Sequence, residues 1–349
     1  MKKQFDLYAL VRPNVARMSA YSSARDEFTD FDKAMVFLDA NENPFNNGVN
    51  RYPDPQQGKL KDLLASQKEV SKEQLLLGNG SDEVLDLIFR AFCVPGKDNI
   101  ISLPPTYGMY KVLSNTNDIE NREVLLTKDF QPDIKAIFEQ VDVHTKIIFL
   151  CSPNNPTGNL IAQKSIEEIG TRFHGLVVID EAYIDFADSE SWTKRMAKYP
   201  NIIVIQTLSK AYGMAGIRLG MAFASTEIIR LLTKIKPPYN VNKLTQEKAI
   251  NHITKRDIVD NEIYSILEIK SILCKELLDI NYVVKIFPSD ANFLLIRVDN
   301  ADKRYQQLIE KGIVVRNRST QPLCHNTLRF TIGTSDETTI LIKALKSLS

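Results

Sequence analysis

Lys210 is the residue of this 349-residue chain whose surroundings best suit covalent chemistry. It follows an apolar run and a Thr-Leu-Ser turn, and small residues come soon after it, among them Ala211, Gly213 and Ala215. A lysine held among such neighbours loses its charge more easily and can attack a carbonyl carbon. Surface lysines far outnumber reactive ones, so Lys210 taken alone also fits an ordinary exposed side chain.

Asp180, Tyr183 and Asn155 are polar residues that could work beside such a lysine. Asp180 ends the apolar run Leu176–Ile179, so we expect its carboxylate at the edge of a sheet and partly buried. A buried carboxylate needs a cationic or hydrogen-bonding partner, and the pyridine nitrogen of pyridoxal phosphate is one such partner. A salt bridge to Arg218 or a helix cap explains Asp180 equally well. Tyr183 and Asn155 can each hydrogen-bond a phenolic oxygen.

A glycine-rich turn, Gly78–Glu83, leads into a predicted helix. Its two glycines let the backbone approach a ligand, and Ser81 or Asp82 can cap the helix. A helix N-terminus presents free N–H groups, which suits a phosphate, although a plain glycine turn with a helix cap is the alternative. The turn matches neither the ATP-binding nor the dinucleotide-binding glycine motif. Further candidates for holding a phosphate are Gly80, Thr207, Ser209 and Arg218, the last by charge-assisted bonds.

These residues follow short apolar runs, which we expect to be buried strands. The runs Thr145–Leu150, Leu176–Ile179 and Ile202–Ile205 have strand length, and helical patterns at Ser165–Phe173 and Ser191–Lys198 lie between them. Apolar runs without alternation are typical of parallel strands covered on both faces, and the alternating order indicates an α/β sheet. Ligands bind at the carboxyl ends of the strands in such sheets. The candidate residues lie at those ends.

The character of the chain changes after Pro237 and Pro238. A charged, helical stretch runs from about Thr245 to Leu278, and short predicted strands around a helix near Asp302–Lys311 follow it. We therefore predict an N-terminal segment, 1–35, that packs on a smaller domain or a partner subunit, and a large domain, 36–245. A long linking helix and a smaller α+β domain would occupy 246–349. The predicted strands of that domain are Val283–Phe287, Phe293–Val298, Gly312–Val315 and Leu328–Ile332.

Composition excludes several classes of protein. The 44 Lys and Arg residues balance 43 Asp and Glu residues, so we expect no nucleic-acid partner. The apolar runs are far shorter than the ~20 residues that span a bilayer, and no signal-peptide core is evident, so we expect no membrane association. The four cysteines and four histidines lack metal-ligand spacing. We predict no metal site and a cytoplasmic location.

The five central residues follow one another at intervals of 25, 3, 27 and 8 positions: Asn155, Asp180, Tyr183, Lys210 and Arg218. This order of N-P-T-G, D-E-A-Y and S-K motifs, with an arginine eight residues on, resembles the fold-type-I pyridoxal-phosphate aminotransferases. The resemblance implies an α/β fold. A large domain with a mostly parallel seven-stranded sheet between helices would stand beside a smaller α+β domain.

Further motifs resemble the histidinol-phosphate aminotransferases over most of the chain, from about Arg12 to Thr334. They are Arg12–Val15, Tyr21–Arg25, Leu38–Pro44, Arg51–Asp54, Pro104–Tyr110, Cys151–Gly158, Gly312–Arg316 and Leu328–Gly333. The resemblance implies that Lys210 binds pyridoxal 5′-phosphate covalently and then moves the α-proton of the substrate. Asp180 would pair with the pyridine nitrogen, and Asn155 and Tyr183 would contact the phenolic oxygen.

The same resemblance implies a role for two further tyrosines. Tyr107 would stack on the cofactor ring, although its loop alone is equally compatible with core packing. Tyr52 would reach the cofactor phosphate of the partner subunit, which makes the enzyme a homodimer. The remaining contacts of that phosphate would come from Gly80, Ser81, Asp82, Thr207, Ser209 and Arg218.

The resemblance implies a reaction that interconverts L-histidinol phosphate and 2-oxoglutarate with imidazole acetol phosphate and L-glutamate. Arg316 and Arg329, on neighbouring strands of the smaller domain, can direct two guanidinium groups at the substrate phosphate. Structural ion pairs are the alternative for both arginines. Tyr21 would close over the same end of the substrate. Two related enzymes stay open as alternatives, an aromatic amino-acid aminotransferase and a threonine-phosphate decarboxylase.

Overall fold

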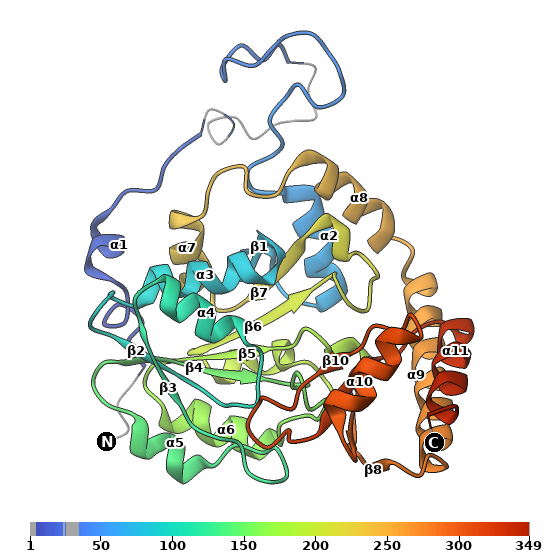
Figure 1. The fold of residues 1–349 in the computed structure, drawn as a ribbon. Helices are drawn as coiled ribbons and strands as arrows, with labels where there is room; N and C mark the ends of the chain where they lie inside the picture. The colour runs from blue at the N-terminus through green and yellow to red at the C-terminus, as the bar shows by residue number, and fades with distance from the viewer. Residues whose placement is uncertain (1–4, 24, 26–34, 349) are drawn as a thin grey trace.

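Two β-sheets organise the chain. The computed structural model of the protein describes residues 5–23, 25 and 35–348. A seven-stranded sheet comes from residues 75–223, and a four-stranded sheet from residues 283–331 (Figure 1).

The larger sheet has the strand order β1-β7-β6-β5-β4-β2-β3. Strands β2 to β6 run parallel to one another, and β7 lies antiparallel between β6 and β1. The predicted mostly parallel seven-stranded sheet is confirmed. The strands are β1 Leu75–Asn79, β2 Asn99–Ser102, β3 Glu120–Glu123, β4 Thr145–Cys151, β5 Leu176–Asp180, β6 Ile202–Thr207 and β7 Leu219–Phe223.

Apolar cores cover both faces of this sheet. Leu176 and Val178 of β5 pack into the core that contains α3, α4 and α7, whereas Val177 and Ile179 pack into the core that contains α2, α5, α6 and α8. Because successive side chains point to opposite faces, a strand buried on both faces needs an unbroken apolar run. These helices are α2 Gly58–Lys68, α3 Gly80–Phe92, α4 Met109–Thr116, α5 Ile134–Gln140, α6 Gln163–Arg172, α7 Thr226–Ile235 and α8 Lys243–Ile253.

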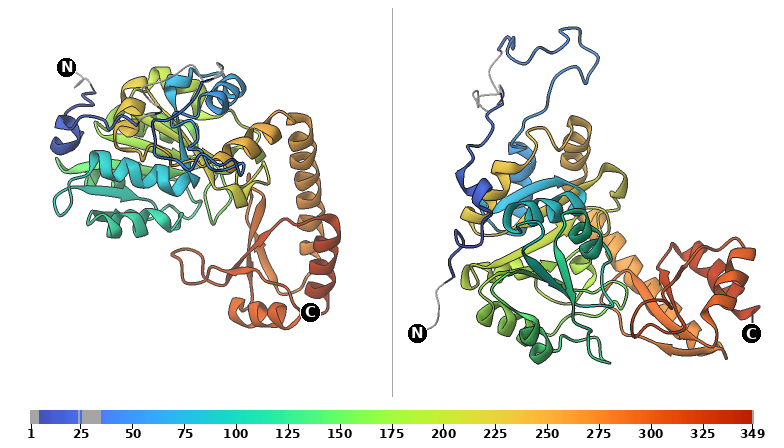
Figure 2. Two further views of the ribbon diagram at one scale, coloured as in Figure 1. Left: turned by 90° about the horizontal axis from the view of Figure 1, so that it is seen from above. Right: turned by 60° about the vertical axis from the view of Figure 1, so that its left-hand side comes forward.

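The smaller sheet has the order β10-β11-β9-β8 and is antiparallel throughout. Its apolar residues pack with α9, α10 and α11 in a third core. Figure 2 shows this sheet and its helices as a lobe beside the body, connected to it by the long helix α9. The elements are α9 Arg256–Leu278, β8 Val283–Ile286, β9 Phe293–Val298, α10 Ala301–Glu310, β10 Arg316–Asn317, β11 Thr327–Thr331 and α11 Ser335–Lys346.

Three predicted elements differ from the structure. The helical stretch from Thr245 to Leu278 is two helices, because the backbone leaves helical geometry at Lys255, between α8 and α9. The predicted strand Gly312–Val315 is wrong: Gly312 turns the chain with a φ of +76°, and pairing begins only at Arg316. The stretch Ser191–Lys198 forms a 3-10 helix, Trp192–Lys198. The other short helices are α1 Pro13–Arg17, η1 Lys72–Gln74, η2 Ile184–Phe186 and η4 Ala215–Ile217.

Residues 35–52 form a loop that projects from the body ahead of α2 (Figure 1). The Glu42 carboxylate holds this loop, since it accepts hydrogen bonds from Arg25, from Arg51 and from the backbone N–H of Tyr52. Several apolar side chains of the loop face solvent, and Leu38 is 87% exposed. The predicted boundaries at residues 35 and 245 stay predictions.

Within residues 5–23, 25 and 35–348, no helix has the length and apolar character needed to cross a membrane.

Candidate active site

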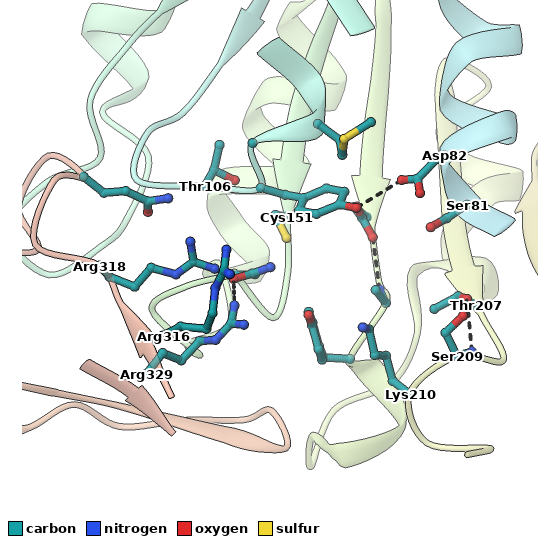
Figure 3. A pocket seen from close by; sticks show the side chains of 18 of the residues that line it. Ser81, Asp82, Thr106, Cys151, Thr207, Ser209, Lys210, Arg316, Arg318 and Arg329 are labelled. Atoms are coloured by element: carbon teal, nitrogen blue, oxygen red, sulfur yellow. Dashed lines mark hydrogen bonds between the residues drawn. The ribbon is translucent and has the colours of Figure 1, made fainter. Parts of the chain in front are cut away.

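A cavity of about 570 Å³ opens where the carboxyl ends of β4, β5 and β6 face the smaller sheet. Figure 3 shows that its walls come from both sheets, with Lys210 and Thr207 on one side and three arginines on the other. The cavity brings together twelve of the predicted site residues. They are Ser81, Asp82, Tyr107, Asn155, Asp180, Tyr183, Thr207, Ser209, Lys210, Arg218, Arg316 and Arg329.

Asp180 ends β5 with its side chain facing the cavity, and the residue is 3% exposed. Its carboxylate accepts hydrogen bonds from the Tyr110 hydroxyl at 2.9 Å and from the Ala182 N–H at 3.1 Å. Burial raises the pKa of Asp180 to about 6, since it forms no ion pair with a described residue. The alternative of a salt bridge to Arg218 is wrong, because that guanidinium lies 3.5 Å from Asp82 instead. Asp180 is a buried acid in need of a cation.

Lys210 lies on the turn that follows β6. Leu208 is buried beneath the turn, and its carbonyl accepts a hydrogen bond from the Met214 N–H, which closes the loop around the lysine. The Lys210 Nζ lies 5.8 Å from the centre of the Tyr183 ring. Burial, and after it the positive charge of Arg329, lower the pKa of Lys210. A lysine in this setting more readily provides the neutral amine that a nucleophile requires.

The turn before α3 and the backbone at Arg218 form one cradle. The Gly80 N–H donates to the Arg218 carbonyl at 2.9 Å, and Gly80 has a φ of +77°. A Cβ at Gly80 would lie 2.5 Å from the Arg218 guanidinium, so only glycine lets that side chain lie across the turn. No side chain of the described residues caps α3, so the predicted cap by Ser81 or Asp82 is wrong. First-turn N–H groups are therefore left for an anion. The hydroxyls of Thr207 and Ser209 lie 3.0 Å apart beside this cradle.

The Asn-Pro-Thr-Gly turn uses its two asparagines differently. Asn154 is buried and anchors the turn, since its amide donates to the Pro105 carbonyl at 2.8 Å and to the Thr157 hydroxyl at 2.7 Å. Asn155 faces the cavity, where its side-chain oxygen accepts a hydrogen bond from Arg329. This contact joins the Asn-Pro-Thr-Gly turn after β4 to β11 of the small sheet at the cavity.

Two tyrosines complete the wall of the large sheet. The Tyr107 hydroxyl donates to Asp82 at 3.0 Å, and the residue lines the cavity. Tyr183 is 7% exposed and packs edge-on against Phe293 of β9. Burial raises the pKa of both phenols, so both stay protonated and can donate.

The smaller sheet contributes more arginine than the sequence motifs indicated. Arg316 pairs with Arg329 across β10 and β11, and Arg318 lines the same cavity. None of the three forms an ion pair with a carboxylate in the described part of the chain, so the structural alternative for Arg316 and Arg329 is wrong. The sequence analysis gave no role to Arg318 or to Tyr110, although Tyr110 lies within the motif Pro104–Tyr110. The alternation of Arg316 and Arg318 could have indicated Arg318, whereas no feature of the sequence indicates the contact of Tyr110 with Asp180.

Tyr52 and Tyr21 lie outside this cavity. Tyr52 stacks on Tyr239 with 4.3 Å between the ring centres and is 51% exposed. Tyr21 is 74% exposed and lines a separate hollow beside α2 and α7. Neither completes the site of its own chain.

The donor set of the cavity fits pyridoxal 5′-phosphate. A buried carboxylate without a cation suits a pyridine nitrogen, and a lysine with a lowered pKa suits an aldehyde carbon. An uncapped helix N-terminus beside an arginine suits a phosphate. The cavity therefore has a place for each end of the cofactor.

The family comparison agrees with this site. A family model described as aminotransferase class I and II matches residues 32–345, and the chain belongs to this family. It is 62% identical over 346 residues to the histidinol-phosphate aminotransferase of Flavobacterium johnsoniae and to that of Christiangramia forsetii; each alignment covers 99% of both chains. The crystal structure of the histidinol-phosphate aminotransferase from Clostridium acetobutylicum shares the fold, with a TM-score of 0.79 and 24% identity over 86% of this chain and 91% of that chain.

Within its family the chain thus groups with the histidinol-phosphate aminotransferases. The resemblance, the fold-type-I architecture, the aminotransferase class and the pyridoxal-phosphate cofactor are confirmed.

Proposed function

We propose that this enzyme transfers the amino group of L-histidinol phosphate to 2-oxoglutarate and yields imidazole acetol phosphate and L-glutamate, as a step of histidine biosynthesis. The identity of 62% over nearly the full length of two relatives named histidinol-phosphate aminotransferase carries the proposal. The arginines of the smaller sheet support it, since guanidinium groups without carboxylate partners suit a phosphorylated substrate.

Each wall residue has a role in this proposal. The cofactor supplies an electron sink for the charge that develops at the α-carbon of the substrate. Lys210 would hold the cofactor and would take the α-proton of the substrate as a general base. Asp180 would keep the pyridine nitrogen protonated, and Asn155 and Tyr183 would hydrogen-bond the phenolic oxygen. Tyr107 would stack on the ring.

The remaining residues would position the two phosphates. The N–H groups of Ser81 and Asp82 beside Gly80 would hold the cofactor phosphate, together with Thr207, Ser209 and Arg218. Arg316 and Arg329 would hold the phosphate of the substrate, and the partner subunit's Tyr21 would close over that end, since Tyr21 lies outside the cavity of its own chain.

The visible spectrum of the purified holoenzyme tests the reaction. Addition of histidinol phosphate alone should remove the absorbance band of the lysine-bound cofactor, and 2-oxoglutarate should restore it. The same measurement with phenylalanine and with threonine phosphate separates the two alternatives. A faster loss of the band with either of these amines would contradict the proposed substrate.

We also propose that the protein is a cytoplasmic homodimer whose subunits exchange Tyr52. The loop of residues 35–52 supports this arrangement, because it is held in shape by Glu42 while Val36, Leu38 and Phe45 face solvent. A second copy of the chain is a partner that would bury these side chains in an isologous interface. Sedimentation of the active enzyme at assay concentration tests the dimer, and a fully active monomer would refute it.

A further inference from the structure

The arginines of the smaller sheet lie on one face of two strands. Arg316 stands directly opposite Arg329 in the pairing of β10 with β11. Arg318 comes two residues later, and its N–H donates to the Thr327 carbonyl, so the extended pairing continues past β10. Since alternate residues of a strand share a face, all three side chains point to the cavity (Figure 3).

This face is short of negative charge and of hydrogen-bond partners. Like charges directly opposite each other destabilise a sheet, and no carboxylate of the described residues pairs with these arginines. The Nε atoms of Arg318 and Arg329 and the Oε1 atom of Gln321 are buried without a hydrogen-bond partner among the same residues. Burial, Arg329 and Arg316 lower the pKa of Arg318 to about 10, which leaves it charged at neutral pH. A face built this way needs an anion to complete it.

The arginines differ in their distance from the reacting centre. Arg329 hydrogen-bonds Asn155, and of the three arginines it is the one whose charge lowers the pKa of Lys210. Arg318 interacts instead with Arg329, Arg316 and Tyr183, and it lies behind Arg329 as seen from Lys210 (Figure 3). An anion that Arg329 binds reaches Arg318 only if it extends further into the small-sheet wall.

The two amino donors of the proposed function differ in this extent. The α-carboxylate of glutamate is bonded directly to the carbon that bears the amine. The phosphate of histidinol phosphate is joined to that carbon through a methylene group and an ester oxygen, and it carries a second negative charge. We propose that Arg318 determines specificity for the phosphorylated donor: it contacts the phosphate ester and does not reach the α-carboxylate, whereas Arg329 serves both. This inference rests on the proposed function.

Single turnovers of the holoenzyme, started with histidinol phosphate or with L-glutamate, test this division of roles between Arg318 and Arg329. For Arg318→Gln we expect the second-order rate constant with histidinol phosphate to fall about 10- to 150-fold, the effect of one lost charge-assisted hydrogen bond. The rate constant with glutamate should stay nearly unchanged. Arg318→Lys keeps the positive charge but lacks the planar guanidinium group, so it should recover part of the lost rate.

A matched control removes a positive charge from the same lobe outside the cavity. Lys303→Gln, on the exposed side of α10, should change neither half-reaction.

Arg318→Gln should also fold at least as well as the wild type, because it relieves repulsion between like charges. A variant that unfolds at a lower temperature than the wild type would contradict this picture.

Equal losses in both half-reactions, or no loss in either, would overturn the role of Arg318 and leave the proposed function intact. A wild-type holoenzyme that does not react with histidinol phosphate would refute the proposed function, and this inference with it.

Discussion

The two walls of the cavity differ in how they balance charge. On the wall of the large sheet, opposite charges and hydrogen-bonding groups face one another, as Arg218 faces Asp82 and Tyr110 faces Asp180. On the wall of the small sheet, arginines face one another and no carboxylate of the described chain pairs with them. One wall is largely satisfied before any ligand binds, and the other is not.

This difference in charge balance corresponds to how long the ligand of each wall stays bound. A wall that holds a resident cofactor can fold with its groups already positioned, and in the proposed function the cofactor would supply the cation that Asp180 lacks. A wall that binds successive substrates must keep its donors free until each substrate arrives, and it folds with the repulsion that this entails. Variants on the two walls should therefore fail in different ways.

The largest loss should follow Lys210→Ala on the large-sheet wall. In the proposed function one amine serves as both the covalent anchor and the base, so turnover should fall by on the order of 10²–10⁴ from proton transfer alone. The absorbance band of the lysine-bound cofactor should disappear, while the phosphate cradle still binds the cofactor. Stopped-flow spectroscopy and equilibrium dialysis measure the two effects.

Lys270 provides the control for that variant. Burial lowers its pKa as well, but its ammonium donates to the carbonyls of Ser289 and Ala291 away from the cavity. Lys270→Ala should lose stability and keep turnover. Turnover of Lys210→Ala close to that of the wild type would refute the assignment of the base.

Asp180→Asn should give the next largest loss, at least about 10²-fold in the half-reaction, because breaking a buried charged pair costs about 3–5 kcal/mol. The adjacent Glu181 is a matched control. It is 1% exposed, burial raises its pKa to about 7, and it accepts hydrogen bonds from Ser191, Trp192 and Gln206 rather than facing the cavity. Glu181→Gln should leave the half-reaction rate nearly unchanged. Equal rates for the two variants would make Asp180 a structural residue.

The same substitution should change how the stability of the cofactor-free protein depends on pH. The pKa of Asp180 is about 6 in the folded chain, above the value near 3.9 of an unfolded aspartate, so the folded state holds more protons between these pH values. Its contribution is therefore present below pH 4 and is lost as the pH rises through 6, by about 3 kcal/mol. Asp180→Asn should flatten this part of the pH dependence, which urea unfolding at pH 4 and pH 7 measures. If the free energy of unfolding of Asp180→Asn falls between pH 4 and pH 7 as much as that of the wild type, then Asp180 is not a buried, unpaired carboxylate in the folded chain.

On the small-sheet wall, Arg329→Ala should weaken the reaction with histidinol phosphate about 10- to 150-fold, because a charge-assisted bond is worth about 1.5–3 kcal/mol. Unphosphorylated aromatic amines that lack a carboxylate should lose far less. Steady-state kcat/KM for the two kinds of amine gives the comparison. Similar losses for both would mean that Arg329 does not contact the phosphate.

The walls also differ in how far the sequence predicts them. Residues such as Asp180 and Lys210 directly follow long apolar runs, and parallel strands bring their carboxyl ends to one edge, so local pattern and sheet topology together locate them. The position of Arg318 depends instead on where β10 begins to pair with β11, and Gly312 shifts that start beyond the apolar run. Tyr110 reaches Asp180 from a helix on another strand connection, a contact that no local pattern encodes.

The smallest effect should come from Tyr52→Phe. In the proposed dimer this change removes one neutral hydroxyl group from the contacts of a phosphate that several other groups also hold. A typical hydrogen bond contributes about 0.5–1.5 kcal/mol, so cofactor affinity should fall about 2- to 10-fold, with turnover restored at saturating cofactor. Tyr8→Phe is the control, because Tyr8 lies elsewhere and is 69% exposed, and this variant should leave cofactor affinity unchanged.

The proposed exchange of Tyr52 between subunits predicts the behaviour of mixed dimers. When Tyr52→Phe chains are mixed with Lys210→Ala chains, each mixed dimer has one site with an intact lysine and the partner's intact tyrosine. Those sites should bind cofactor with wild-type affinity. If mixing leaves their affinity at the Tyr52→Phe level, then Tyr52 acts within its own chain, and the large-sheet wall does not depend on a second subunit for its phosphate.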